Sequence, residues 1–317
     1  MALDHFIPQV YLKNFYSPKL GKLMYAIRKS DLKTFTPDAK SVCRIEDGST
    51  NKYLKEARLV EEFLKGIEPK YNKALARLWD DNVDPECIYV IAGFVAYISS
   101  CSPAFMRIQS EYLRGIVEHT TQLEDSHGRL PTPPPELGGE TFTDLLQKGK
   151  IVVEVDGKFP QAFAIANILS SIKRFGNFKW DILINPFGDN TFFTSDSPVA
   201  IEQTNNPRVL NKIVPLSPSI AIRICPDLSI CEKNLDFTFS HFRATRRNIN
   251  LSKVININKL IVRCAETTVF FRDNHDWVRK FVSKNANYRI ESEVVKFPTE
   301  RGHALFFPMF ISEIKGN

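Results

Sequence analysis

Two residues far apart in the chain, His5 and Asp196, have the side chains and the sequence context that catalysis requires. Pro8 suits the first turn of a helix, so His5 is expected just before a helix N-terminus. There the helix dipole disfavours imidazolium and leaves a neutral ring that accepts a proton or binds a metal. Asp196 follows an apolar segment and is expected at the rim of a sheet, where ligand sites commonly form. The structural alternatives are that His5 anchors the N-terminal turn on backbone carbonyls and that Asp196 bonds its own turn.

A second carboxylate is expected from an amphipathic helix that carries Glu61, Glu62 and Glu68. We take Glu62 as the third catalytic residue, beside His5 and Asp196. A histidine with two carboxylates suffices for general acid–base chemistry or for a hydrolytic centre with a divalent metal, although the sequence identifies no metal. The alternative is that the glutamates form a solvated helix face.

Three further residues are expected to hold the substrate. The planar fork of Arg107 suits a phosphate or a carboxylate, or alternatively a buried ion pair with one of the helix glutamates. Thr194 and Ser195 are neighbouring hydrogen-bond donors in the turn that contains Asp196. Ser195 is not expected to act as a nucleophile, because the glycine-flanked elbow that exposes a catalytic serine is absent.

A basic stretch in the C-terminal half is a candidate surface for a polyanion. Arg246 and Arg247 are its expected substrate-binding residues, and aromatic residues between the charges suit stacking of a nucleobase. A solvated charged helix face is the alternative. The other members of the stretch are Arg243, Lys253, Lys259 and Arg263, interleaved with or preceded by Phe237, Phe239, His241 and Phe242.

A nuclease-like pattern occurs at Asp156-Gly157-Lys158, directly after the apolar run 151–155. Metal-dependent nucleases of the restriction type place Asp/Glu-x-Lys at a strand end, where the lysine assists the attacking water. However, Asp-Gly is also the strongest two-residue turn signal, and no Pro-Asp lies close upstream of it. A plain turn is therefore the favoured interpretation.

Composition excludes several classes of protein and site. The six cysteines form no C-x-x-C pair, so neither a zinc site nor a disulfide framework is expected. No glycine-rich phosphate loop occurs, so no nucleotide cofactor is expected. The apolar run 88–98 is about half the ~20 residues that span a bilayer, and no signal peptide is visible, so we expect a cytoplasmic protein without membrane contact. A net charge of +6 permits nucleic acid as a partner.

Hydrophobic periodicity predicts a first part made mainly of helices. The expected helices are 8–16, 54–79 (as one helix or two broken at Glu68-Pro69), 88–99 and 103–121, with strands at 22–29 and 41–45. The second part is expected to hold a strand at 151–155, helices at 159–175 and 247–266, and strands at 180–184, 191–194, 213–216, 219–225, 237–244 and 288–297.

Residues 124–140, rich in proline and glycine, mark the clearest boundary because they suit neither a helix nor a central strand. We expect a helical region with a short β element over 1–123, a loop over 124–140, and an α+β region over 141–317, with one integrated domain as the alternative. The fold class is thus α+β: a helix-rich N-terminal half packed with a mainly antiparallel sheet from the C-terminal half.

The chain opens with a His-x-x-Pro-x-x-Tyr-Leu-x-x-Phe pattern over 5–15, continues with Thr-Ser-Asp-Ser-Pro over 194–198, and has Pro-Leu-Ser-Pro over 215–218. Together these three segments resemble the bacterial domain-of-unknown-function family numbered 4238. A Pro-x-x-x-Arg element over 103–107 also fits, although Ser102 stands where the family more often has a basic residue. The resemblance spans residues 5 to about 270. It implies a shared architecture and supplies no activity.

These residues support two hypotheses of function. The first is an enzyme that acts on a nucleic-acid or phosphorylated substrate, with a hydrolase or nuclease chemistry and a role as a toxin or phage-defence effector. The second is a non-catalytic module that binds protein or nucleic acid through the phenylalanine-rich C-terminal half. The first requires the His5 and Asp196 side chains to meet in one cleft.

Overall fold

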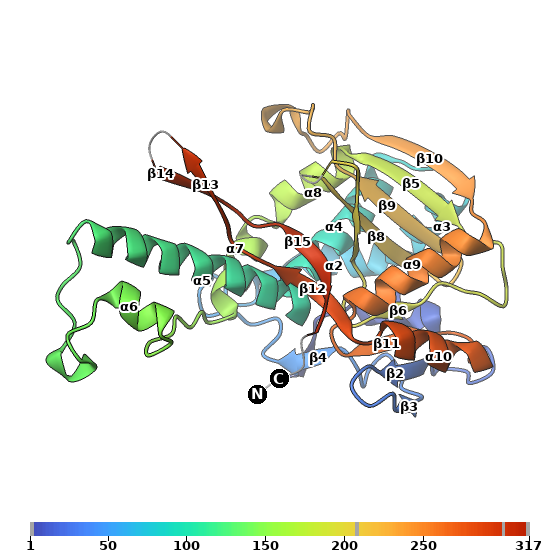
Figure 1. Cartoon of the computed structure of the whole chain (residues 1–317). Helices are drawn as coiled ribbons and strands as arrows, with labels where there is room; N and C mark the ends of the chain where they lie inside the picture. The colour runs from blue at the N-terminus through green and yellow to red at the C-terminus, as the bar shows by residue number, and fades with distance from the viewer. Residues whose placement is uncertain (1–2, 207–208, 300–301, 315–317) are drawn as a thin grey trace.

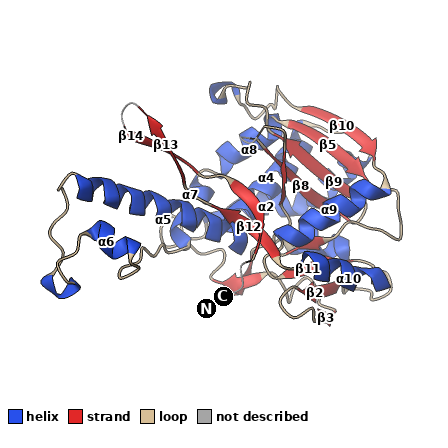
Figure 2. Ribbon diagram, viewed as in Figure 1, coloured by secondary structure: helices blue, strands red, loops and turns tan. Residues whose placement is uncertain are grey.

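The fold combines helices from the N-terminal half with sheets formed largely by the C-terminal half, as expected for an α+β protein (Figures 1 and 2). The computed structural model describes residues 3–206, 209–299 and 302–314. The helices are α1 (Gln9–Leu12), α2 (Leu59–Ile67), α3 (Tyr71–Trp79), α4 (Pro85–Cys101), α5 (Pro103–Ser126), α6 (Phe142–Gln147), α7 (Lys158–Ala166), α8 (Ile168–Asn177), α9 (Leu251–Cys264) and α10 (Asp276–Asn285). Short 3-10 turns are η1 (Lys13–Phe15), η2 (Glu68–Lys70), η3 (Pro135–Leu137) and η4 (Glu232–Asn234).

The larger sheet has five strands in the order β10-β5-β9-β8-β7. β10 pairs parallel with β5, and the other neighbours are antiparallel. The bounds of these strands are β5 (Lys179–Ile184), β7 (Ala200–Gln203), β8 (Leu210–Ser217), β9 (Ile220–Cys225) and β10 (Arg243–Asn248). β10 is an edge strand, and in Figure 1 it lies at the periphery of the molecule.

A second sheet of four antiparallel strands has the order β3-β2-β11-β6 and joins the N-terminal strands to later parts of the chain. Its strands are β2 (Tyr25–Arg28), β3 (Thr34–Phe35), β6 (Thr194–Ser195) and β11 (Thr268–Phe271). Three separate pairings form from β1 (Leu3–His5) with β4 (Arg44–Glu46), β12 (Tyr288–Ser292) with β15 (Met309–Glu313), and β13 (Val295–Thr299) with β14 (Gly302–Phe306).

The central helix α4 is buried around almost its whole circumference, as its uninterrupted apolar sequence predicts. It begins sharply because the Asp84 side chain accepts a hydrogen bond from the Cys87 amide and Pro85 occupies the first turn. Ser102 ends it, and Pro103 starts α5. Buried side chains from both halves of the chain, from Phe6 to Ile290, form one continuous core around this helix.

No single helix within the described ranges is long and apolar enough to cross a membrane. Only α4 and α5 taken together reach that length and apolarity, and they meet at a bend of 61°.

Several elements differ from the sequence-based expectations. The run 151–155 is not a strand, because no described strand pairs with it, and Val152 is 73% exposed. The expected helix over 159–175 is two helices, α7 and α8, separated at Asn167. Helix α5 continues to Ser126, and the predicted loop therefore starts later than expected. The late strand expected over 288–297 is two strands, β12 and β13.

The basic stretch was assigned the wrong boundaries between strand and helix. Arg243–Asn248 pairs with β5, so the strand expected over 237–244 lies further along the chain. The helix expected from Arg247 starts at Leu251, because the Asn250 side chain accepts a hydrogen bond from the Lys253 amide and caps it. The sequence does not predict strands β1, β3, β7, β11, β14 and β15 or helices α6 and α10.

The hydroxyl of Tyr11 joins three distant segments in the core. It hydrogen-bonds the Thr194 Oγ1 atom and donates to the Pro215 carbonyl oxygen over 2.8 Å. Tyr11 is fully buried, and burial raises its pKa well above the usual value. Helix α1, strand β6 and strand β8 are thereby fixed to one another at a single buried atom.

Replacement of Tyr11 by Phe tests this junction. We expect the free energy of unfolding to fall by about 1–3 kcal/mol, because the Thr194 hydroxyl and the Pro215 carbonyl lose their buried partner. Urea denaturation with an unchanged m value is the measurement. Tyr25→Phe is the control, since the Tyr25 ring stacks on Phe271 and its hydroxyl has no hydrogen bond within the described residues. Equal stability of the two variants would contradict the assignment.

Candidate functional site

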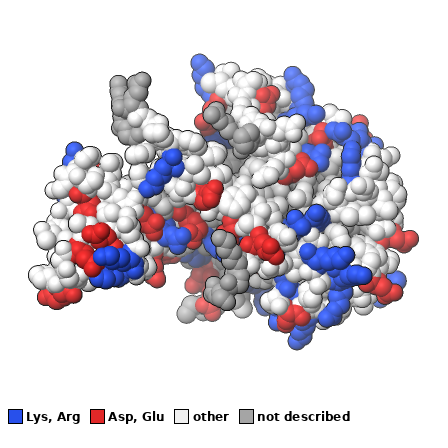
Figure 3. Space-filling view, in the orientation of Figure 1, with Lys and Arg blue, Asp and Glu red and all other residues white. Residues whose placement is uncertain are grey.

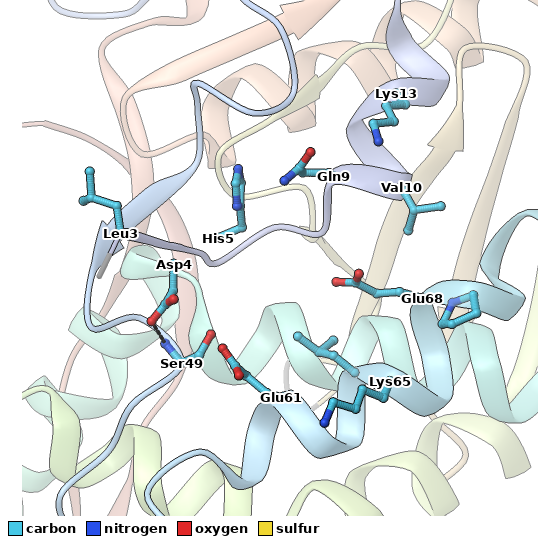
Figure 4. Close-up of a pocket in the computed structure, with 12 residues that line it drawn as sticks. Leu3, Asp4, His5, Gln9, Val10, Lys13, Ser49, Glu61, Lys65 and Glu68 are labelled. Carbon is cyan, nitrogen blue, oxygen red and sulfur yellow. Dashed lines mark hydrogen bonds between the residues drawn. The ribbon is translucent and has the colours of Figure 1, made fainter. Parts of the chain in front are cut away.

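A cleft of about 720 Å³ lies between the N-terminal segment and helix α2 (Figure 4). Strand β1 and helix α1 form one wall, and α2 with the turn η2 forms the other. The residues that line it include six charged or titratable side chains: Asp4, His5, Lys13, Glu61, Lys65 and Glu68. The first family motif therefore borders the cleft, with its apolar members in the core and His5 at the surface.

His5 is held by the backbone on one side of this cleft. Its Nε2 atom lies 3.1 Å from the Lys40 carbonyl oxygen, and β1 pairs His5 with Arg44 of β4. Partial burial lowers the pKa of the imidazole, and the carbonyls of Ala39 and Lys40 oppose that effect. The ring is consequently mostly neutral near pH 7. This arrangement agrees with the structural alternative for His5, in which the ring anchors the N-terminal turn.

Glu68 is the half-buried carboxylate of the cleft. Figure 4 shows its side chain directed into the space between α1 and α2, with the Lys13 ammonium on the opposite wall. Burial raises the pKa of Glu68, and the charge of Lys13 opposes this rise. Among the described residues, Glu68 has neither a salt bridge nor a side-chain hydrogen bond. A perturbed, unpaired carboxylate in a cleft is a recognised mark of a functional site.

The other carboxylates near the cleft have partners. Asp4 accepts a hydrogen bond from the Ser49 amide over 3.0 Å. Glu61 pairs with Arg58. Glu62, the glutamate that we had expected to be catalytic, is exposed, pairs with Lys65 over 2.6 Å and does not line the cleft.

Asp196 is buried and holds the backbone of a neighbouring turn. Its carboxylate accepts hydrogen bonds from the amides of Glu266, Thr267 and Thr268 at 2.7–3.0 Å, and from the Thr267 hydroxyl. Burial raises the pKa of this carboxyl, while the same hydrogen bonds lower it. Asp196 therefore caps the turn between α9 and β11. Its role is structural, but it binds the backbone of this other turn and not the backbone of its own turn, as the structural alternative had it.

His5 and Asp196 are not brought together. His5 lines the large cleft, whereas Asp196 lines a smaller cavity of about 300 Å³ beside Cys43, Pro103 and Glu266. The carboxylate of Asp196 already has four donors, so it has little capacity for a substrate. The two side chains thus line separate cavities, although Phe6, which follows His5 in the chain, borders the cavity of Asp196.

The residues expected to hold substrate near Asp196 are also engaged. Arg107 makes a two-pronged ion pair with Glu266, with distances of 2.9 and 3.1 Å, and also contacts Glu291 and the Ile290 carbonyl. Its partners are thus different glutamates from those on α2. Thr194 and Ser195 are completely buried, Thr194 against Tyr11 and Ser195 as the acceptor for the Ser197 amide.

The basic residues of β10 lie at the edge of the larger sheet and are exposed. Arg247 pairs with Asp181 over 2.7 Å, and Arg246 has no ion pair within the described residues. Figure 3 shows lysine and arginine side chains, mixed with some acidic ones, over the region where β10, β5 and α9 lie. Phe239 is buried and Phe242 packs on Trp180, so these two rings are not free to stack on a base.

The Asp156-Gly157-Lys158 pattern does not lie at a strand end but leads into helix α7, which begins at Lys158. Asp156 pairs with Lys52, which lowers the pKa of that carboxyl to about 2. The Lys158 ammonium donates to the Asp47 and Thr50 carbonyls, so it is not directed at a metal-bound water. No group of three or more His, Cys, Asp or Glu side chains suited to a metal occurs in the described ranges.

Comparison with known proteins identifies the family. The model of a family described as a protein of unknown function, DUF4238, matches residues 4–275, so the chain belongs to this family, as the motifs indicated. No curated protein and no solved structure matches the chain. The match ends before β12, so the strands β12–β15 lie outside it.

Replacement of Asp196 by Ala tests its structural role. Three backbone amides would lose their buried acceptor, so we expect a loss of roughly 3 kcal/mol in the free energy of unfolding. Asp196→Asn, which keeps one acceptor oxygen, should lose less. Asp156→Ala is the control and should cost below about 1 kcal/mol, because its ion pair is exposed. Thermal denaturation followed by circular dichroism measures all three, and an Asp196→Ala protein as stable as the wild type would contradict this role.

Proposed function

We propose that the protein is a hydrolase that acts on a phosphorylated or nucleic-acid substrate, with its chemistry in the cleft between α1 and α2. Glu68 is the general base and Lys13 holds the phosphate. The observation that supports this most directly is an unpaired, half-buried carboxylate that faces a lysine across this cleft of about 720 Å³. Asp196 and Glu62 have no part in this site.

The reaction follows from the properties of these two groups. Burial raises the pKa of Glu68, which makes the ionised carboxylate a stronger base than an exposed glutamate. It takes a proton from a water molecule as the water oxygen attacks phosphorus. The ester P–O bond then breaks, and the leaving oxygen takes a proton from solvent. Lys13 offsets negative charge on the phosphoryl oxygens.

His5 is a positioning residue in this proposal. Its contact with the Lys40 carbonyl fixes the start of the segment that leads into α1, from which Lys13 extends. Nucleic acid is the substrate class favoured by the net charge of +6 and by the exposed Arg246. A role as a toxin or phage-defence effector would follow from hydrolysis of such a substrate inside a cell.

Glu68→Gln tests the assignment of the base. We expect hydrolysis of bis(p-nitrophenyl) phosphate, p-nitrophenyl phosphate or short RNA and DNA strands, with Mg²⁺ present and absent, to fall about 10²–10⁴-fold. Glu62→Gln is the matched control, since Glu62 lies on the same helix but outside the cleft. Wild-type activity in Glu68→Gln, or no hydrolysis of any of these substrates by the wild type, would refute the proposal. In bacteria, growth inhibition that requires Glu68 is the expected cellular result.

The pH profile provides an independent test. Glu68 accepts a proton only when ionised, so activity should fall as the pH drops through a pKa that burial places above the usual 4.5. Because Lys13 lowers this pKa, Lys13→Ala should move the acid limb to higher pH as well as weaken substrate binding. The measurement is kcat/KM against pH for both proteins. An acid limb that stays in place in Lys13→Ala would contradict the pairing across the cleft.

A further inference from the structure

A second cavity continues the cleft along the same helical face. It measures about 370 Å³ and is lined by Asn14, Asn72, Leu75, Ala76, Trp79, Asp80, Ser217 and Ile220. Residues close together in the chain line the two cavities. Lys13 lines the first cavity and Asn14 the second, and Pro69 of the first is followed in the chain by Asn72 of the second. The two cavities are therefore neighbours along the segment from α2 to α3, and together they are called the groove below.

The helical wall of this groove is a single stripe. Residues 61, 64, 65, 68, 69, 72, 75, 76 and 79 line it and recur at spacings of one, three or four. Side chains at three- and four-residue spacing share one face of a helix, and the stripe continues through the turn η2 from α2 into α3. Glu68 and Trp79 are eleven residues apart along it, which is a rise of roughly 17–18 Å at about 2.0 Å per residue in η2 and 1.5 Å in α3.

Trp79 is an exposed aromatic side chain at the far end of the groove. It is 43% exposed, and its indole has no hydrogen bond or ring contact within the described residues. Exposed tryptophan is costly to solvate and is enriched where a protein binds a ligand. A flat indole face at a cavity wall suits the stacking of a planar ring.

The side-chain amides of Asn14 and Asn72 present one unused hydrogen-bond donor and one unused acceptor at the wall of the second cavity. Asn14 Nδ2 donates to the Val10 carbonyl over 3.0 Å and to Asn72 Oδ1 over 3.2 Å. Within the described part of the chain, Asn14 Oδ1 and Asn72 Nδ2 have no hydrogen-bond partner. An adjacent acceptor and donor complement the edge of a nucleobase, which presents the same pair of functions in reverse.

Charge fixes the orientation of a ligand along the groove. Lys13 lies at the cleft end and Asp80 beside Trp79. Among the described residues, lysines line only the cleft, so a phosphate has a cationic partner at Lys13 and none beside Trp79, although Asp4, Glu61 and Glu68 also line the cleft. The phosphate is therefore placed beside Lys13 and the uncharged ring on Trp79.

We propose that this second cavity is a nucleobase subsite, formed by Trp79, Asn14 and Asn72, that receives the base of a nucleotide whose phosphate lies near Lys13. The indole stacks on the base, and the two amides bond its edge. The proposal rests on the proposed function for the position of the phosphate, and it identifies the substrate class as a nucleotide, free or at the end of a single strand.

Binding by AMP, by the base-free analogue ribose 5-phosphate and by a five-residue oligo(dA) tests the subsite. We expect AMP and the oligonucleotide to bind more tightly than ribose 5-phosphate. Isothermal titration calorimetry gives the affinities. Quenching of Trp79 fluorescence reports stacking, because Trp180 is fully buried and Trp277 stacks on Phe193. AMP bound as tightly as the oligonucleotide indicates a free nucleotide, and tighter binding of the oligonucleotide indicates a strand end; both support the subsite.

Trp79→Ala should weaken AMP binding roughly 5- to 150-fold, which corresponds to the ~1–3 kcal/mol of base stacking, and should leave ribose 5-phosphate unchanged. Asn72→Ala is the second variant, with a smaller loss of AMP affinity. Phe163→Ala, at an aromatic ring that is 70% exposed on α7, is the matched control and should change neither affinity. Circular dichroism verifies that all three variants fold.

The result that would overturn the subsite is AMP binding no tighter than ribose 5-phosphate, or AMP binding unaffected in both Trp79→Ala and Asn72→Ala. Glu68→Gln separates this outcome from failure of the catalytic proposal. If AMP binding depends on Trp79 but no hydrolysis depends on Glu68, the subsite stands and the hydrolase assignment fails. If hydrolysis depends on Glu68 while Trp79→Ala binds AMP normally, the reverse holds.

Discussion

One hydroxyl group in the core determines how the two halves of this protein meet. Tyr11 bonds both Thr194 and the Pro215 carbonyl, and these three residues come from different segments of the family-matched region. A neighbouring ring, Tyr71 of α3, donates in the same way to the Leu216 carbonyl. Because the polar atoms are fully buried, each is costly to leave unpaired, so the position of α1 against β8 is tightly specified. The groove between α1 and the α2–α3 stripe is a consequence of that position.

The polar residues of the other motifs form a second buried network around the turn after α9. Asp196 binds the amides of this turn, and the Lys29 ammonium donates to the Ala265 and Tyr288 carbonyls. Burial lowers the pKa of Lys29 to about 8, against the opposing charges of Asp196 and Glu266. Arg107 extends the network from Glu266 to Glu291, and so connects the family-matched region with β12 beyond it. These charged groups specify the fold and leave little capacity for chemistry.

The sequence predicted local features well and long-range partners poorly. The buried helix over 88–99 and the break at Glu68-Pro69 follow from apolar pattern and proline chemistry alone, and both are present. The failures share one cause. Whether 151–155 becomes a strand, where β10 begins, and whether Arg107 and Asp196 are free all depend on a partner far away in the chain. A carboxylate in a turn has the same local sequence whether it meets a substrate or three backbone amides.

The same reasoning explains why Glu68 could be listed among the candidates but not selected. The sequence does not distinguish among three glutamates on one predicted helix. The structure distinguishes them, because Arg58 pairs with Glu61 and Lys65 pairs with Glu62. Helical spacing places Glu68 on the same stripe as Glu61 but out of reach of Arg58. The nearby charge that acts on Glu68 is that of Lys13, at the start of η1. An opposite charge that lowers its pKa without bonding it leaves the carboxylate both ionisable and accessible. That combination, which the paired carboxylates beside it lack, is what a general base requires.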